Sequence, residues 1–399
     1  VDALQKEIET LKGQIREPAG SDFHVYWKEG IRLESADKAF RFAIGGRVFN
    51  DWAWMSQDEQ IETEHGELED GTEFRTARLS VEGTIYERMI LKAEYDFAGG
   101  EAAFKDVYIG LEGLPTLGTL KVGHFKEPFS LEELTSARFI TFMERGLPNA
   151  FSPGRNVGLS FSNAVLDERV TWAVGIFRDA DDFGFGTGDR GGYSLTTRVT
   201  GLPWYADEGS RLLHLGFSWS HRDPEDDEVR FRQRPEVHLA PRFVDTDEFA
   251  AREVDLLAVE TALVYGPASI QGEYMRADVD ALSGSNPDFA GFYVMGSYFL
   301  TGEHRKYKES SGAFSRVKPK SNFLDGKGGL GAWEVALRYS DLDLNDLGAG
   351  ISGGELRDFT AGINWYLNPN ARVMLNYVLS EQHGVGDADI VAMRFQVDF

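Results

Sequence analysis

A short run of arginines stands out in an otherwise acidic chain. The stretch "VRFRQRPEVHLAPRF" (229–243) carries a single acid, Glu236, and four arginines: Arg230, Arg232, Arg234 and Arg242. If the stretch is extended, the first three arginines project from one side at intervals of about 6.5–7 Å. A planar guanidinium binds two oxygens of an oxyanion at once. The spacing therefore predicts a ladder of shallow anion sites, backed by Val229, Phe231 and Gln233 on the other side.

The acids on either side of this run leave an alternative open. "DPEDDE" precedes it and "DTDE" follows it. In the ladder interpretation these acids lie on an outer rim while the arginines line a passage. In the alternative, the stretch is a surface loop whose arginines pair with the flanking acids.

Two further segments carry basic residues at places where they could narrow a passage. The segment 125–156 contains Lys126, Arg138, Arg145 and Arg155 among many apolar residues, so we expect it to fold inward rather than face water. The segment 302–330 contains seven basic residues against three acids. It would either hold a vestibule at positive potential or be an ordinary solvated loop. We expect the anion signal to come from these inserted segments rather than from the surrounding wall, whose charges are mixed.

The elements that must position these segments are β-strands. From Phe40 onward, apolar and polar residues alternate with a period of two; in "DIVAMRFQVDF", Val391, Phe395 and Val397 share one face while Arg394 takes the other. We count sixteen such segments: 40–54, 73–86, 88–97, 103–112, 117–126, 156–164, 168–178, 191–202, 211–222, 253–265, 267–279, 289–301, 331–342, 355–367, 370–381 and 387–399.

The connections between these segments alternate in length. Tight turns such as "YER", "LDE" and "LNPN" alternate with long acidic loops, among them "DLNDLGAGISGGEL"; segment 302–330 is the exception, because it is long where a short turn is expected. Strands of this length can cross a bilayer, and short turns on one side with long loops on the other are typical of an outer-membrane barrel. A propeller or stacked sandwich would also alternate, but no repeat at blade period is present. The sequence therefore predicts a 16-stranded antiparallel transmembrane β-barrel.

Composition narrows the classes of function. The formal charge of -24 disfavours nucleic acid as a partner. Cysteine is absent, and we find none of the common nucleophile, phosphate-loop or metal-ligand motifs. The longest stretch without charged residues, 289–302, is shorter than the roughly 18 residues that a membrane helix needs. We expect no enzyme activity, no metal and no cofactor, since passage through a wide barrel needs only a constriction with a charge pattern.

The first 17 residues differ from the rest. Val1, Leu4, Ile8, Leu11 and Ile15 follow a heptad spacing, which predicts a short coiled-coil segment; a lone amphipathic helix lying on its own protein is the alternative. We expect three regions: 1–17 as a periplasmic coiled coil, 18–39 as a linker and 40–399 as the barrel. The chain starts at Val1 rather than Met, which we interpret as a processed form.

Several motifs resemble the phosphate-selective porin O and P family of Gram-negative outer membranes. They are "VGHFKEPFSLEELTSARFITFMERGLP" (122–148), "GAFSRVKPKSNF" (312–323), "AGINWYLNPNARVMLNYV" (361–378) and the terminal Phe399. The resemblance implies a homotrimer whose inserted segments narrow each lumen. It also implies roles by position: Arg230, Arg232, Arg234 and Arg242 as ladder residues with Arg75 and Arg78 in "FRTAR", Arg145 as the constriction arginine, and Lys306, Lys308, Lys318 and Lys320 as a periplasmic cluster.

We therefore predict a trimeric porin of the outer membrane, with its N-terminus in the periplasm, that passes small anions such as phosphate or polyphosphate. Its other expected partners are membrane lipids, lipopolysaccharide and a periplasmic or cell-wall partner of residues 1–17. Two alternatives stay open. One is a general diffusion porin without anion preference, in line with the acidic composition. The other is a structural outer-membrane protein tethered through its N-terminal segment.

Overall fold

The computed structural model describes residues 23–187 and 191–399. The predicted coiled coil of residues 1–17 lies outside the described residues.

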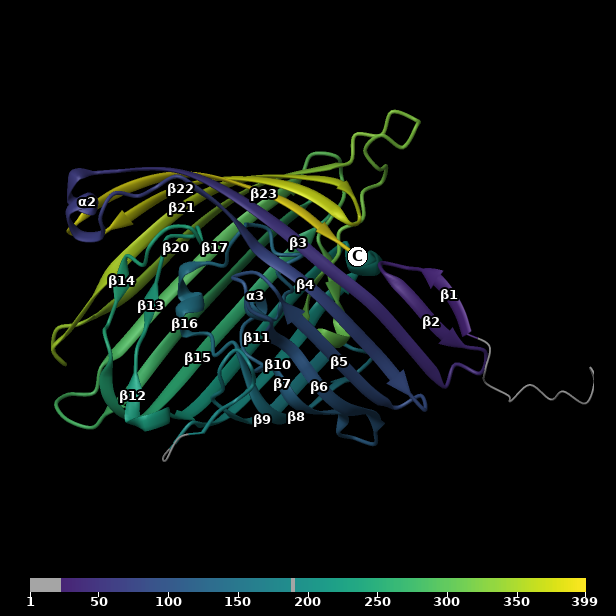
Figure 1. Ribbon diagram of the computed structural model, residues 1–399, viewed down its shortest axis with the longest axis horizontal. Coiled ribbons are helices and arrows are strands. Elements are labelled where there is room, and N and C mark those ends of the chain that lie inside the picture. Colours follow the sequence, from purple (N-terminus) through teal and green to yellow (C-terminus); the bar gives the residue numbers. More distant parts are fainter. Residues whose placement is uncertain (1–22, 188–190) are drawn as a thin grey trace, which may run out of the picture.

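Sixteen antiparallel strands form a closed barrel, as the sequence predicts (Figure 1). Each strand pairs with the next one, and the last, β23, pairs with the first, β3, from Asp398↔Arg47 to Ala388↔Gln57. The strands are β3 (Phe40–Gln57), β4 (Gly71–Ile85), β5 (Met89–Asp96), β6 (Ala103–Leu114), β7 (Gly118–Lys126), β8 (Arg155–Val165), β9 (Val170–Arg178), β10 (Tyr193–Ala206), β11 (Arg211–Asp223), β15 (Phe249–Tyr265), β16 (Ala268–Ala281), β17 (Asp288–Phe299), β20 (Ala332–Asp346), β21 (Ile351–Asn368), β22 (Ala371–Gln382) and β23 (Gly386–Asp398).

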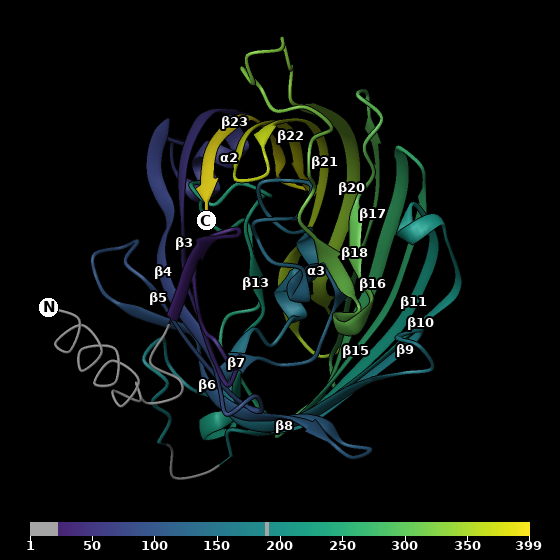
Figure 2. The same cartoon turned by 90° about the vertical axis from the view of Figure 1, so that its right-hand side faces the viewer.

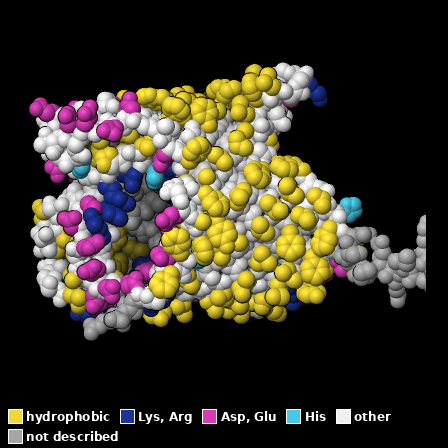
Figure 3. Space-filling model, viewed as in Figure 1, with side chains coloured by type: hydrophobic (Ala, Val, Ile, Leu, Met, Phe, Trp, Pro, Cys, Tyr) yellow, Lys and Arg dark blue, Asp and Glu magenta, His cyan; other side chains and the backbone are white. Residues whose placement is uncertain are grey.

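Side chains alternate between the two faces of this wall. On β23, Arg394 and Gln396 are buried in the interior, whereas Phe395 and Val397 are about half exposed on the outside. On the side seen in Figure 3, the outer face of the wall is largely apolar away from the charged left-hand end. Because a bilayer solvates apolar side chains and a water-filled interior solvates charges, this distribution is that of a membrane-spanning barrel. Among the described residues, no helix is long and apolar enough to cross a membrane.

A hairpin extends the wall where the sequence led us to expect a linker. Within 18–39, β1 (Phe23–Trp27) pairs with β2 (Ile31–Ser35), and β2 pairs with β3 from Ile31↔Ile44 to Glu34↔Arg41. The hairpin continues the sheet beyond the end of β23. Its turn needs Gly30, which has a φ of 123° and lies so close to Ile44 that a Cβ would come within 2.8 Å of that carbonyl oxygen.

The two ends of the barrel differ. At the end that carries Phe399, here called the turn end, the strands are joined by tight turns except for the connection 300–331, which holds β18 (Lys306–Lys308), η4 (Glu309–Ser311) and β19 (Ala313–Ser315). The opposite, loop end carries the long connections 58–70, 127–154, 179–192 and 224–248. The predicted long loop 343–356 is wrong: β20 and β21 continue through it and leave only the turn 347–350.

The remaining short elements of the fold lie in three long connections and one turn. α2 (Glu59–His65) closes over the loop end, and 127–154 contains α3 (Leu131–Leu134) and η1 (Leu147–Phe151). The connection 224–248 contains η3 (Glu225–Asp227), β12 (Glu228–Val229), β13 (Arg232–Gln233) and β14 (Val244–Asp245); η2 (Asp207–Gly209) makes a tight turn. Seen from the turn end, α3, β13 and β18 lie inside the ring of strands (Figure 2). The barrel is therefore narrowed from within.

Candidate constriction and permeation path

The connection 127–154, here called the constriction loop, fills part of the lumen. Its apolar side chains are buried, with Phe129, Phe142 and Leu147 all 0% exposed. Ser130 caps α3 by accepting a hydrogen bond from the Glu133 N–H at 3.1 Å. The loop therefore folds inward because its apolar side chains find partners only against the wall and the other insert.

Polar groups of the wall hold this loop mainly by its backbone. Glu273 on β16 accepts hydrogen bonds from the N–H groups of Leu131 and Glu132 at 2.9 and 2.8 Å. Five side chains of β20–β23 donate to five carbonyl oxygens of residues 138–144: Gln396 to Arg138 at 3.1 Å, Arg372 to Ile140 at 2.9 Å, Asn364 to Thr141 at 2.7 Å, Arg394 to Met143 at 2.6 Å and Arg338 to Glu144 at 2.9 Å. The loop is thereby fastened to one side of the barrel.

Open space remains on the other side, where a cavity of about 170 Å³ lies between the loop and the wall. Only two carboxylates line it, Asp106 and Glu144. Nine basic side chains do so: Arg47, Arg75, Arg78, Lys92, Lys126, Arg138, Arg145, Arg155 and Arg394. We call it the cationic cavity. Five of the sequence-predicted site residues meet here, namely Arg75, Arg78, Lys126, Arg138 and Arg145.

The predicted site set omits four residues of the cationic cavity: Arg47, Lys92, Arg155 and Arg394. All four stand on strands, β3, β5, β8 and β23, and alternation alone assigns Arg47, Lys92 and Arg394 to the lumen side. We expected the anion signal to come from the inserted segments rather than from the wall. Segment 125–156 supplies Lys126, Arg138, Arg145 and Arg155, and the other five cations of the cavity stand on the wall strands β3, β4, β5 and β23. The wall charges looked mixed because the wall strands also carry the acidic partners of these cations, such as Glu94 for Arg47 and Asp51 for Arg394.

These cations are paired with carboxylates at the rim of the cavity. Asp106 bridges Lys92 and Arg155 at 2.9 and 2.8 Å. The remaining close pairs are Arg47–Glu94 (2.7 Å), Arg78–Asp96 (2.7 Å), Arg75–Glu144 (2.9 Å), Arg394–Asp51 (2.6 Å), Lys126–Glu133 (2.7 Å) and Arg145–Glu133 (3.1 Å), with Arg138 3.8 Å from Asp398. Nine bases thus meet seven acids, an excess of two positive charges.

Two acids of the constriction loop stay ionised because of these neighbours. Burial alone would raise the pKa of Glu133, but Arg145 and Lys126 lower that pKa to about 2. Burial likewise opposes ionisation of Glu144, while Arg75 and Arg394 hold its pKa far below the usual value. The cations Arg145, Lys126, Arg75 and Arg394 are therefore shared with fixed, ionised carboxylates.

The arginines at the loop end do not form one uniform ladder. Arg230 pairs with Asp245 at 2.7 Å and lies 3.6 Å from Glu248, so the surface-loop alternative describes this residue. Arg234 is half-buried and donates to the carbonyl oxygens of His238 and, at 3.1 Å, of Ala240. Both contacts are local to the insert.

Arg232 and Arg242 are different, because both are exposed and neither has an ion pair within the described part of the chain. Burial lowers the pKa of Arg242, and the nearby charges of Arg232 and Arg234 lower it further, which indicates that these three cations share one region. Basic side chains gather in the hollow at the loop end, with acidic ones around it (Figure 3).

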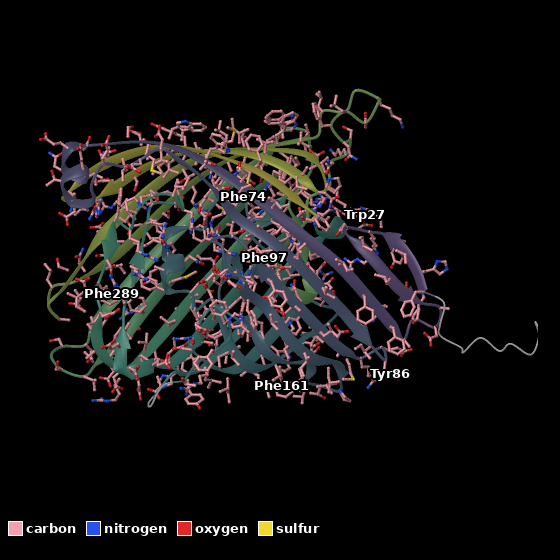
Figure 4. The ribbon with its side chains drawn as sticks, viewed as in Figure 1. Trp27, Phe74, Tyr86, Phe97, Phe161 and Phe289 are labelled. Atoms are coloured by element: carbon pink, nitrogen blue, oxygen red, sulfur yellow. The ribbon has the colours of Figure 1, made fainter. Side chains whose placement is uncertain are left out.

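An apolar face backs this insert, as the alternation predicts. Phe231 packs against Phe151 of the constriction loop and Phe289 of β17, with ring centroids 5.3 and 5.6 Å apart; Figure 4 labels Phe289 near the loop end. Deeper in the lumen, Glu236 is 2% exposed and accepts from Arg338 at 2.9 Å, from Ser340 and from Thr360. The second insert therefore binds the β20–β21 wall through Glu236, and it also contacts β4, where His238 lies 2.7 Å from Glu73.

The four predicted lysines at the turn end do not gather in one cluster. Lys318 pairs with Glu29 at 2.7 Å. Lys306 and Lys320 lie close enough to His304 to act on it: burial lowers the pKa of His304, and these two charges lower it further. Lys308 lines a vestibule of about 530 Å³, whose bases are matched by Glu29, Glu34, Glu82 and Glu112. The inner mouth is thus mixed in charge rather than basic.

The sequence and fold were compared with those of known proteins. Residues 42–399 match the family described as phosphate-selective porin O and P. Porin O of Pseudomonas aeruginosa is 26% identical over 95% of this chain and 93% of its own length, and an uncharacterized protein of Caulobacter vibrioides is 30% identical over 96% of this chain and 78% of its own.

Two solved structures illustrate the likeness in fold. An anion-selective porin from Comamonas acidovorans has a TM-score of 0.58 at 15% identity, covering 90% of this chain and 100% of that one. The outer-membrane channel DcaP of Acinetobacter baumannii has a TM-score of 0.53 at 13% identity, covering 92% and 99%. The sequence match, the closed barrel and the narrowed lumen agree: the chain belongs to the phosphate-selective porin O and P family and is an outer-membrane porin of a Gram-negative bacterium, a channel rather than an enzyme.

Proposed function

We propose that this porin passes small anions passively, with phosphate as the favoured permeant. The observation that carries the proposal is the cationic cavity, in which nine basic side chains and two carboxylates face one narrow space. Arg suits phosphate because its guanidinium can donate to two phosphate oxygens at once, and Lys suits it because its ammonium is a mobile point charge. Relatives support the choice, since the family is described as phosphate-selective and one structural neighbour as anion-selective.

The path we propose runs along the wall formed by β3–β8. An anion enters at the loop end, where Arg232 and Arg242 are exposed without ion pairs within the described residues. It then exchanges between the paired cations of the cationic cavity. Permeation needs several weak sites rather than one deep site. The ion pairs provide this, because each carboxylate competes with the anion for the same guanidinium.

A general diffusion porin with little anion preference is the second candidate. One observation favours it: all nine cations of the cavity have carboxylates within ion-pair distance, so the excess is only two charges. Reversal potential across a planar bilayer in a KCl gradient separates the two candidates. An anion porin gives a reversal potential near the chloride equilibrium value, and phosphate lowers its chloride conductance by block, whereas a general porin gives a reversal potential near zero and no phosphate block.

We also propose that the porin is a homotrimer with its turn end in the periplasm and its outer face in contact with lipid and lipopolysaccharide. The heptad pattern of residues 1–17 supports self-association, and a solved porin with the same fold is described as a trimer. Deleting residues 1–17 tests a tethering role. Loss of envelope attachment at unchanged conductance would indicate a tether, and loss of the trimer would indicate an assembly segment.

A further inference from the structure

A small cavity lies where three parts of the chain meet. Arg138 and Phe139 of the constriction loop, Arg316 and Val317 of the connection 300–331, and Arg372 with its neighbours on β21–β23 line it. Its volume is about 20 Å³, which is enough for one water molecule or one monatomic ion but not for a tetrahedral oxyanion. We call it the junction cavity. It shares Arg138 with the cationic cavity and otherwise has its own lining.

The charge around the junction cavity is unbalanced. Three guanidinium groups line it and Asp398 is the single carboxylate among its lining residues. Asp398 binds Arg316 with both oxygens, one at 3.2 Å, and lies 3.8 Å from Arg138. Arg372 is 2% exposed. No carboxylate of the described ranges, 23–187 and 191–399, lies within ion-pair distance of it.

The contacts of Arg372 are to neutral groups. It donates to the Ile140 carbonyl and to Gln396, both at 2.9 Å, and to the Tyr366 hydroxyl at 3.3 Å. Glu334 is reached only through that hydroxyl, which donates to it at 2.8 Å. Neutral acceptors satisfy N–H groups without cancelling the charge, and a buried charge without a counter-ion is strongly unfavourable.

Two donors near the cavity also lack partners. The Nε–H groups of Arg372 and Arg316 are buried and donate to no acceptor among the described residues. For Arg316 the nearest carboxylate at Nε is that of Glu29, 3.6 Å away. The ring of Phe139 lies 5.0 and 5.2 Å from the guanidinium carbons of Arg138 and Arg316, which brings these two cations to one ring that lines the cavity. A ligand here would meet buried donors and positive charge.

We propose that the junction cavity binds one monatomic anion, of the chemistry of chloride, which supplies the negative charge that the protein omits. The ion would contact the Nε of Arg372 and lie between the constriction loop, the connection 300–331 and the last strands. It would thereby fasten the loop that sets the width of the passage. The proposal is independent of which anion permeates, because a bound structural ion need not travel along the conduction path.

Diffraction from crystals of the full chain grown in sodium bromide tests this directly. We expect an anomalous bromide peak in the junction cavity of the wild-type protein. The peak should disappear in Arg372→Gln and persist in Arg357→Gln, which removes a charge from the outer face of β21. A cavity that holds only a water without an anomalous peak overturns the proposal, and so does a peak that persists in Arg372→Gln, since that would be an adventitious ion only.

Thermal unfolding gives a second measurement. At equal ionic strength, the wild-type protein should unfold at a higher temperature in sodium bromide than in sodium gluconate, whose anion is too large for the cavity. The difference between the two salts should shrink in Arg372→Gln and remain in Arg357→Gln. Equal shrinkage in both variants, or no difference in the wild type, overturns the proposal. If Arg372→Gln does not fold, the wild-type bromide peak decides alone.

Discussion

Replacing Glu133 with Gln removes one negative charge from beside the cationic cavity, where Glu133 pairs with two lining cations, without changing the shape of the side chain. Glu133 lies 2.7 Å from Lys126 and 3.1 Å from Arg145. An anion that contacts either cation from the cavity side sits roughly 6 Å from the Glu133 carboxylate. At that distance the repulsion of a unit charge is about 0.7 kcal/mol in water and about 2.8 kcal/mol at an effective dielectric constant of about 20.

The substitution should therefore strengthen phosphate binding roughly 3-fold to roughly 100-fold, since about 1.4 kcal/mol corresponds to a factor of ten. Single-channel chloride current with increasing phosphate measures this as a lower half-blocking concentration. Glu59→Gln on α2 removes the same charge from an exposed position outside the cavity and serves as the matched control. An unchanged or weaker block in Glu133→Gln, with the control also unchanged, would refute the view that fixed carboxylates compete with the permeant.

Three further outcomes are expected. Neutralising Arg232 and Arg242 together should lower anion conductance at 0.1 M salt and have little effect at 1 M, where the Debye length falls to about 3 Å; single-channel recordings at both salt concentrations check this. Arg338→Gln leaves the buried carboxylates of Glu132 and Glu236 without their cation and should lower the free energy of unfolding by about 3–5 kcal/mol. Arg357→Gln on the outer face should have a small effect, and denaturant unfolding of both variants measures the difference. The pKa of Glu133 in the folded state is lowered to about 2, so its ion pairs stabilise the protein fully above its ordinary pKa of 4.5 and lose that contribution as the pH falls toward 2. Unfolding midpoints measured from pH 7 to pH 2 should therefore fall mainly below pH 4.5. A flat profile below pH 4.5 would contradict the pairing.

The strands could be predicted because burial on one face imposes a strict period of two on each of them. A shift of one residue would place every charge in lipid, so the pattern is strongly constrained. The hairpin 23–35 was missed although Phe23, Val25 and Trp27 alternate, because each run is only five residues long. The continuation of β20 and β21 through 343–356 was missed because the glycine and aspartate residues of this stretch are typical of loops. The ends of strands that project beyond the membrane need not be apolar, so they lack the alternating pattern.

The pairing of charges could not be predicted from one sequence. Arg394 and Asp51 are 343 positions apart and meet only because the barrel closes between β23 and β3. Arg230 was assigned to the ladder from its spacing, but the return of the chain through β14 places Asp245 against it. Spacing identifies which side of a strand a residue takes, and the register of distant strands then decides whether its charge is free.

The wall holds the constriction loop through hydrogen bonds to backbone carbonyl oxygens, which every amino acid has. Residues 138–144 could therefore be exchanged widely on the side that faces the passage while the course of the chain is kept. Because the wall binds the backbone of the loop, the shape of the opening can stay the same while the side chains that face it change. The loop offers a natural place to graft new side chains when retuning the pore for another solute, and a route by which relatives could diverge in preference without rebuilding the barrel.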